Sequence, residues 1–248
     1  MSLTEKEEDI KKLIVANCHY GGKKITKQMK RYVHTIRRDG IAIFDVNKIY
    51  EKIQIAARMI ISIDKDAIIS VSGKPAGHRA VYKFGHYTKT QSVSGRWSPG
   101  MLTNQITKKF VEPRLLIVTD PRTDYNALLE SSYINIPVIA ICNSDNMLKY
   151  VDCAIPCNNR SNKAVAMIWY LLTKAVMELN KQQSEFENAT PNEFVNTELE
   201  KKKDKKDLKE KEEEDEEEGG EEDKEEEDDD KKKEEEEEDE GDEDFVDK

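Results

Sequence analysis

The stretch GRWSPG, residues 95–100, has two glycines separated by four residues, as at the start of a phosphate-binding P-loop. A P-loop continues with Lys and then Ser or Thr, because the ammonium reaches the terminal phosphates and the hydroxyl binds magnesium. Here Met101 and Leu102 follow, and neither side chain can do this. The loop is therefore not a nucleotide site of that kind.

Small and polar residues also follow several apolar runs that are predicted to be strands. The clearest cases are Ser72-Gly73-Lys74, Thr119-Asp120-Pro121-Arg122 and Asn143-Ser144-Asp145. Ligands of open α/β sheets bind beyond the carboxyl ends of the strands, so an enzyme could use Asp120 as a carboxylate and Arg96 or Arg122 as anion clamps. Such residues also collect there because the chain must turn. A sugar-phosphate- or nucleotide-binding enzyme is therefore one alternative.

Motifs that would support catalysis are missing from the sequence. No G-x-G-x-x-G follows the apolar run at 41–46, and there is no G-x-S-x-G. The histidines at 19, 34, 78 and 86 lack the spacing of metal ligands, and the four cysteines are irregularly spaced. We expect the cysteines to be buried, reduced thiols. The sequence thus predicts no catalytic residue, no cofactor, no metal and no small-molecule substrate.

Charge is divided unevenly along the chain of 248 residues. Residues 191–248 contain 12 Lys/Arg and 33 Asp/Glu, a net charge of −21, which leaves 28 basic and 18 acidic residues in 1–190, a net charge of +10. The acidic part cannot bury enough apolar surface to offset the entropy of ordering, so we expect one domain at 1–190 and a disordered tail at 191–248. No apolar run is long enough for a membrane span or a signal peptide, which predicts a cytosolic protein without membrane contact.

Basic residues cluster in one window of the domain. Residues 21–38 contain no acid, and Tyr32 and His34 stand among the cations. Cations neutralise phosphates and aromatic rings stack on bases, so this composition favours RNA binding over a merely solvated surface. The candidate residues are Lys23, Lys24, Lys27, Lys30, Arg31, Arg37 and Arg38 in this window, and Lys108, Lys109, Arg114, Arg122 and Arg160 elsewhere.

Apolar runs typical of strands alternate with helical patterns, and these elements must position the candidate residues. Continuous apolar strands that alternate with helices indicate a mostly parallel sheet of about five strands, covered on both faces. The predicted fold class is a three-layer α/β/α sandwich. We predict strands at 41–46, 67–73, 91–95, 115–120 and 138–143, a short extended run at 152–157, helices from about residue 4 to Gly21-Gly22 and at 47–63, 76–88, 124–135 and 161–180, and a helical turn at 102–110.

Several long runs of the sequence resemble a known family. They are CHYGG (18–22), RRDGIAIFDVNKIYEKIQIAARMI (37–60), GHRAVYKF (77–84), SGRWSPGMLTNQI (94–106), EPRLLIVTDPRTDYNALLESSYINIPVIAICNSD (112–145) and YVDCAIPCNN (150–159). In the longest run Pro113, Asp120, Asp124, Glu130 and Pro137 fit the family signature position by position. The sequence resembles the eukaryotic branch of the universal small-subunit ribosomal protein-two family, the ribosomal protein SA or laminin-receptor-precursor group.

The resemblance implies a flavodoxin-like α/β/α domain without enzymatic activity, a structural constituent of the small (40S) ribosomal subunit that is required for its maturation. The expected partners are small-subunit rRNA and neighbouring ribosomal proteins, on cytoplasmic ribosomes after passage through the nucleus or nucleolus. An acidic-tailed ribosome assembly factor is a further alternative. The tail contains no tryptophan, unlike the tails of animal members, so a laminin-binding role is not carried over.

The resemblance also assigns a role to the opening loop, because Arg96, Gly100, Thr103 and Asn104 match a family hallmark. Gly95 and Gly100 around Pro99 predict a stiff turn, and Thr103 or Asn104 could cap the helical turn that follows. We therefore expect a rigid docking loop that displays or packs Arg96 and Trp97. The predicted docking set is completed by Arg79, Arg96, Trp97, Asn104, Asn158 and Asn159, all in the matching runs.

Overall fold

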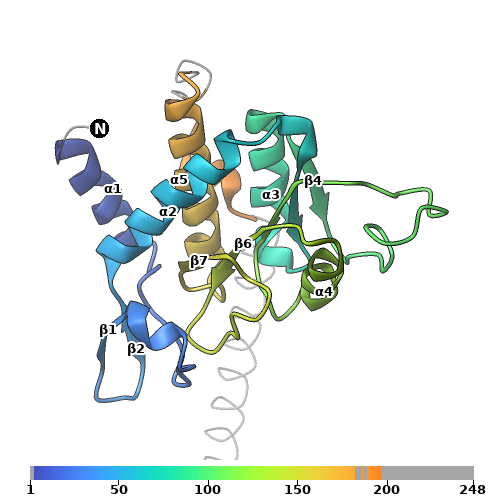
Figure 1. Ribbon diagram of the computed structural model, residues 1–248. Coiled ribbons are helices and arrows are strands. Elements are labelled where there is room, and N and C mark those ends of the chain that lie inside the picture. The colour runs from blue at the N-terminus through green and yellow to red at the C-terminus, as the bar shows by residue number, and fades with distance from the viewer. Residues whose placement is uncertain (1–2, 182–185, 187–188, 197–248) are drawn as a thin grey trace, which may run out of the picture. The chain divides into compact units, whose positions relative to one another are not determined.

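The computed structural model describes residues 3–181, 186 and 189–196. Its centre is a sheet of five parallel strands in the order β4-β3-β5-β6-β7 (Figure 1). Counted along the sheet's own strands, this is the 2-1-3-4-5 order of flavodoxin-like domains, so the predicted fold class is confirmed. The strands are β3 (Ile68–Ser72), β4 (Gln91–Ser94), β5 (Leu115–Val118), β6 (Val138–Cys142) and β7 (Cys153–Pro156).

Helices cover both faces of the sheet. α3 (Pro75–Thr88) joins β3 to β4, and α4 (Tyr125–Ile134) joins β5 to β6 in the opposite direction along the sheet. Since such crossovers are right-handed, the two helices lie on opposite faces. α5 (Asn162–Leu179) packs on both α3 and α2 (Val46–Ile61), which places these three helices on one face. α4 covers the other face, where hydrogen bonds from Trp97, Gly100 and Leu102 to Glu130 attach the first part of the loop at 95–114.

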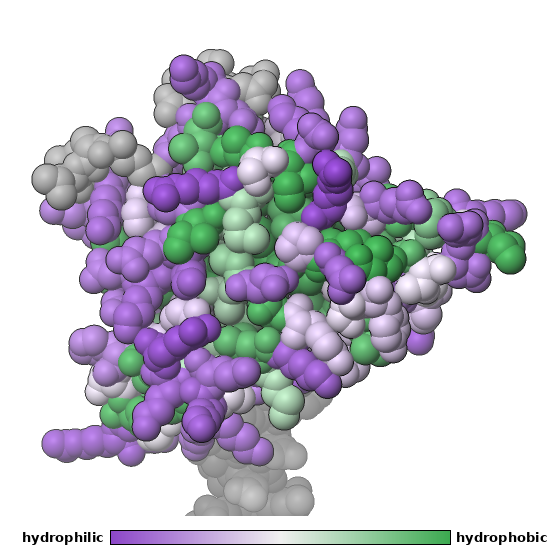
Figure 2. Space-filling view, in the orientation of Figure 1, coloured by the Kyte–Doolittle hydropathy of each residue, from purple (hydrophilic) through white to green (hydrophobic). Residues whose placement is uncertain are grey.

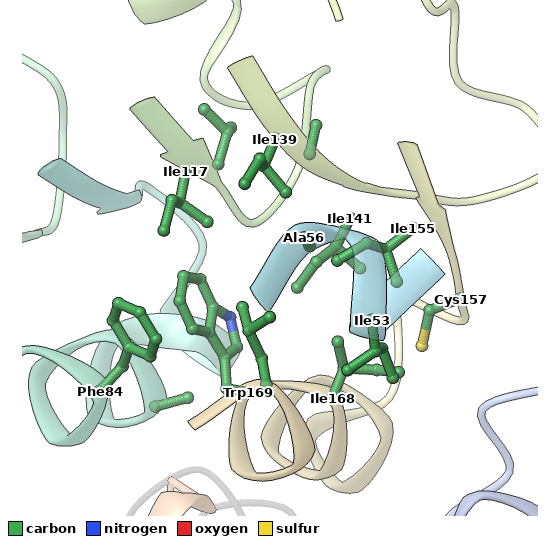
Figure 3. Packing of buried hydrophobic residues seen from close by; sticks show 14 of the residues in the cluster. Ile53, Ala56, Phe84, Ile117, Ile139, Ile141, Ile155, Cys157, Ile168 and Trp169 are labelled. Carbon is green, nitrogen blue, oxygen red and sulfur yellow. The ribbon is translucent and has the colours of Figure 1, made fainter. Parts of the chain in front are cut away.

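The core explains why the central strands read as continuous apolar runs. Every residue of β5, β6 and β7 is buried, because helices or loops cover both sides of these strands. Figure 3 shows Trp169 of α5 beside Phe84 of α3 and below Ile117 of β5, and the two rings meet edge to face at 5.0 Å. Burial of each such large side chain contributes about 1.5–3 kcal/mol, so this layer holds α3 and α5 against the centre of the sheet.

The predicted strand at 41–46 forms but lies outside the parallel sheet. β2 (Ala42–Phe44) pairs antiparallel with β1 (Val33–Ile36), a strand that was not predicted. The Asp39-Gly40 dipeptide makes the turn between them, with Gly40 at φ +79° and a hydrogen bond from Arg37 N to Ile41 O of 2.9 Å. Asp-Gly is a hairpin signal, and the surrounding basic residues obscured it in the sequence.

The first helix ends earlier than predicted. α1 (Leu3–Val15) ends before Asn17, which takes the left-handed conformation at φ 57°, rather than at Gly21-Gly22. Asn17 N donates to Ile14 O (3.0 Å) and Cys18 N donates to Leu13 O (3.1 Å), the two bonds of a Schellman motif. Asparagine is the residue after glycine that best tolerates this position, so it ends the helix. Because the helix ends here, residues 18–28 can run across the carboxyl ends of the strands.

Packing of the described chain continues to Asn196, six residues beyond the predicted domain boundary. The short helix η4 (Pro191–Phe194) buries Phe194 against Tyr170 and Phe186, with ring centroids 5.7 and 6.5 Å away. Lys83 Nζ pairs with Glu193 Oε2 at 2.9 Å. Residues 197–248 lie outside the described residues, so the disordered tail stays a prediction.

The four cysteines are buried free thiols, as predicted. Burial and the neighbouring Cys18 thiol raise the pKa of Cys157, which keeps this thiol protonated. In the part of the chain that the structure describes, no three His, Cys, Asp or Glu side chains lie together as metal ligands. None of the described helices is long and apolar enough to cross a membrane.

Candidate nucleic-acid interface

The place where flavodoxin-like domains bind cofactors is the carboxyl edge between β3 and β5, where the strand order reverses. Here the side chain of Asp124 fills that place. Gly73 N donates to Asp124 Oδ1 at 2.9 Å, and a Cβ added to Gly73 would stand 2.5 Å from the same oxygen. The backbone donor that a bound phosphate would use is therefore occupied by the chain's own carboxylate.

Asp124 is almost completely buried, and its Oδ2 atom has no hydrogen-bond partner among the described residues. Burial raises the pKa of Asp124 from its ordinary 3.8 to about 6, although the bond from Gly73 N opposes this rise. The negative charge of the nearby Asp120 carboxylate is a second cause of this raised pKa. Two buried carboxyl groups at this edge disfavour a bound phosphate.

Asp120, the carboxylate of the enzyme alternative, is also used by its own chain. Its Oδ1 accepts hydrogen bonds from Asn146 Nδ2 and Arg122 N, both at 3.1 Å. Its Oδ2 accepts from Thr123 Oγ1 at 3.2 Å and from Lys74 Nζ at 3.4 Å. With both oxygens occupied, Asp120 stabilises the loops after β3, β5 and β6, which leaves the enzyme alternative without the carboxylate it requires.

The segment that follows α1 closes the next part of the edge, beyond β6. Gly22 N donates to Ser144 Oγ at 2.8 Å, and Thr26 N donates to Ser144 O at 2.9 Å. Farther along, Leu148 N donates to Gln28 Oε1 at 3.1 Å. The approach needs small residues, because a Cβ on Gly21 would lie 3.1 Å from Ala42 O. These bonds fix the predicted basic window over the strand ends.

The basic side chains of this window point to solvent. Arg31 stacks on the ring of Tyr32, with its guanidinium carbon 4.9 Å from the ring centroid. Arg37 pairs with Asp39 at 3.1 Å on the exposed tip of the β1–β2 hairpin. In Figure 2 the surface around β1 and β2 is largely hydrophilic. The exposed cations here are Lys23, Lys24, Lys27, Lys30, Arg31, Arg37 and Arg38.

Arg122 and Arg160 join this surface through Asp145. Their Nη2 atoms lie 3.2 and 3.0 Å from Asp145 Oδ2, and both side chains remain 64% exposed. Arg160 also lies alongside Gly22, so the structure brings these two arginines next to the basic window. Nothing in the spacing of the sequence indicated that one carboxylate would hold both.

Asn158 and Asn159 of the predicted set hold the loop after β7. Asn159 is buried and accepts a hydrogen bond from Asn143 Nδ2 at 3.3 Å. Asn158 Nδ2 donates to Asn17 O at 3.3 Å, and Asn158 Oδ1 accepts from Arg160 N at 3.1 Å. Asn158 therefore positions Arg160 and the end of α1, and Asn159 ties the loop after β7 to the loop after β6.

The GRWSPG loop has the turn that its glycines predict, since Gly95 and Gly100 have φ values of +109° and +87°. A buried carboxylate fixes it. Glu130 of α4 accepts hydrogen bonds from Trp97 Nε1 (3.2 Å), Gly100 N (2.8 Å) and Leu102 N (3.1 Å). Trp97 is only 3% exposed and packs inside the protein, whereas the Arg96 side chain is exposed on the surface.

Beyond this clamp the loop projects from the body (Figure 1). The predicted helical turn at 102–110 is wrong, because residues 101–109 form successive turns without a helix. Asn104 Oδ1 accepts from Ile106 N at 3.1 Å and so makes an Asx turn in place of a helix cap. The exposed residues of the predicted set on this loop are Arg96, Asn104, Lys108, Lys109 and Arg114.

Two predicted residues lie away from the carboxyl edge. Arg114 precedes β5 and its backbone N bonds to Ala67 O, at the amino end of the sheet. Arg79 on α3 donates from Nε to Glu193 O at 2.7 Å, and thereby ties down η4. The predicted set thus divides into a basic surface at residues 23–31, 122 and 160, separate groups on the hairpin tip and the projecting loop, and two outlying residues, Arg79 and Arg114.

A family model described as ribosomal protein S2 matches residues 13–112 and 105–179, which include the carboxyl edge, the Glu130 clamp and the basic window. The chain belongs to the ribosomal protein S2 family. The resemblance to the universal small-subunit protein-two family is therefore confirmed, and the finer assignment to the ribosomal protein SA group stays a prediction.

Members of the S2 family from several eukaryotes are similar in sequence to this chain. A protein of Chlamydomonas reinhardtii is 48% identical over 183 residues, which cover 73% of this chain and 66% of the relative. A Drosophila persimilis protein is 47% identical over 178 residues, covering 71% and 66%, and one of Urechis caupo is 49% identical over 179 residues, covering 72% and 56%. All three are named small ribosomal subunit protein uS2. The aligned region thus spans 56–66% of the length of these relatives.

Proposed function

We propose that this protein is a structural constituent of the small ribosomal subunit, which docks on rRNA and neighbouring ribosomal proteins and catalyses no reaction. The observation that carries the proposal is membership of the S2 family, with relatives at 47–49% identity that bear the name small ribosomal subunit protein uS2. The protein would act on cytoplasmic ribosomes after assembly into subunits that pass through the nucleolus.

The carboxyl edge supports this function over a cofactor-dependent one. The position of a bound phosphate is filled by Asp124, and Asp120 is held by four donors of its own chain. The cations above that edge are exposed and belong to a body with a net charge of +10 in residues 1–190. Phosphates of a polyanion can approach such a surface without entering the fold.

Sedimentation of cell extracts through sucrose gradients tests the proposal. We expect the full-length protein to migrate quantitatively with mature small subunits and to remain there in moderate salt. Migration only with precursor subunits would instead indicate an assembly factor, and migration free of subunits would refute a ribosomal role.

The displayed arginine of the clamped loop allows a matched variant in the same gradients. Arg96→Ala is expected to lower incorporation into subunits with an unchanged melting temperature, because the side chain is exposed and the described hydrogen bonds that fix the loop come from other residues. Arg58→Ala is the control, since Arg58 is an exposed arginine on α2 outside the predicted surface. Equal incorporation of both variants would remove Arg96 from the interface.

A further inference from the structure

A hollow of about 490 Å³ lies between the start of α4 and the loop that follows β6. Its walls are mainly apolar and include Tyr125, Leu128 and Met147. Tyr125 is 46% exposed and Met147 is 76% exposed, so both present open faces. The mouth carries Arg122, Lys149 and Asp145. We refer to this site, defined by these six residues, as the Tyr125 hollow.

The floor of the Tyr125 hollow is rigid. Asn146 is buried beneath it, where its Nδ2 donates to Asp120 and its backbone O accepts from Thr26 Oγ1 at 3.1 Å. Tyr125 is the first residue of α4, so a helix fixes its backbone. Met147 also lines the hollow, and its flexible thioether side chain adapts to a flat group inserted beside it. An exposed aromatic ring and an adaptable thioether in the wall of one hollow make it a slot suited to a planar ligand.

The charges at the mouth favour an anion. Asp145 is shared by Arg122 and Arg160, and Lys149 adds a third positive charge, so the rim has an excess of two positive charges over Asp145. The Lys149 ammonium lies 4.7 Å from the centroid of the Tyr150 ring, which holds it at the rim. An apolar protein side chain in the slot would leave these cations without a counter-charge, whereas a phosphate group would supply it.

We propose that the Tyr125 hollow binds one unstacked nucleotide of single-stranded rRNA. The base stacks on Tyr125 and contacts Met147, and the adjoining phosphate pairs with Arg122 and Lys149. Proteins commonly recognise single-stranded RNA in this way: unstacked bases stack on aromatic side chains, and nearby cations pair with the phosphates. This inference rests on the proposed function and adds to it a defined contact at the edge of the basic surface.

The test compares two single-stranded probes of equal charge, an oligouridine of roughly 12 nucleotides and an abasic ribose-phosphate strand of the same length. Affinities of the full-length protein are measured by fluorescence anisotropy at one fixed salt concentration. Tyr125→Ala is expected to weaken oligouridine binding about 10-fold, as stacking of one base does, and to leave binding of the abasic strand unchanged. Tyr125→Phe is expected to keep the wild-type affinity, because it retains the ring.

Tyr133→Ala is the matched control, since Tyr133 is 67% exposed on the same helix and does not line the hollow. It is expected to bind both probes as the wild type does. If Tyr125→Ala binds oligouridine with wild-type affinity, the nucleotide proposal is overturned. If such a variant is nevertheless lost from small subunits in a sucrose gradient, the hollow docks a protein instead. Failure of the wild-type protein itself to migrate with subunits refutes the proposed function, a separate result.

Discussion

Replacement of Asp124 by asparagine tests the account of the closed carboxyl edge, because it removes the charge and keeps the shape. The asparagine Oδ1 can still accept the hydrogen bond from Gly73 N that is 2.9 Å long in the structure. The wild-type carboxyl has its pKa raised by burial to about 6 from 3.8. At about 1.4 kcal/mol for each pKa unit, this difference corresponds to about 3 kcal/mol.

The sign of the effect follows from where the proton binds more tightly. Because the folded protein holds the Asp124 proton more strongly than the unfolded chain, protonation favours folding below the unfolded pKa. This stabilisation is lost as the pH rises from 3.8 to about 6, and above that the buried charge costs the full amount. The asparagine variant has no such proton, so its advantage over the wild type should grow by about 2.5 kcal/mol between roughly pH 4 and pH 7.5.

Urea unfolding of the full-length protein and of Asp124→Asn, followed by circular dichroism across this pH range, measures the effect. The informative quantity is the difference between the two free energies of unfolding as a function of pH, because constant effects of the substitution cancel in its slope. A difference that is independent of pH would refute the reasoning, since it would show that Asp124 ionises equally easily in the folded and unfolded chain. A slope of the opposite sign would mean that an unseen cation stabilises the charged carboxylate.

Two further substitutions test contacts that position the surface. Glu130→Gln places an amide group opposite one of the three N–H donors of the GRWSPG loop, and it should lower the free energy of unfolding by about 1.5–3 kcal/mol. Hydrogen exchange at the Leu102 amide should become faster, while exchange in β5 should not change. A loop that remains protected in this variant would show that another contact fixes it. Phe194→Ala removes a fully buried ring and should lower the free energy of unfolding in urea by about 3–5 kcal/mol. A chain that ends at residue 190 should lose a similar amount because it lacks Phe194, whereas a chain that ends at residue 196 should keep the wild-type stability. Equal stability of the two shortened chains would place η4 outside the cooperative fold.

The elements with strong local signals could be predicted from the sequence. α2 shows apolar residues at helical spacing, and the buried Ile49, Ile53 and Ile60 lie on its inner face. β5 and β6 are continuous apolar runs because both faces of the sheet are covered. The β1–β2 hairpin could not be recognised in the same way, since β1 is mostly exposed and its residues lack an apolar alternation. Its only signal is the Asp39-Gly40 turn.

The composition of the candidate surface was predictable, but its arrangement was not. An unbalanced run of cations between residues 21 and 38 is visible in the sequence. Its position beside Arg122 depends on hydrogen bonds from Gly22 and Thr26 to Ser144, which join segments about 120 residues apart. No periodicity or motif marks a pairing of that kind. The burial of Trp97 likewise follows from Glu130, whose partners lie 28 to 33 residues away in sequence.

The same groups that close the carboxyl edge also make its rim suitable for docking. In a cofactor-binding domain of this topology, backbone donors and cations at the strand ends remain available to the ligand. Here Gly73 N is bonded to Asp124, and Lys74 is paired with Asp120. These internal bonds immobilise the loops after β3, β5 and β6. The backbone of the exposed Arg122 is therefore already fixed, and little backbone entropy is lost when its side chain binds a phosphate. A rigid rim of cations around a filled crevice therefore favours phosphates of an external polyanion over those of a small cofactor.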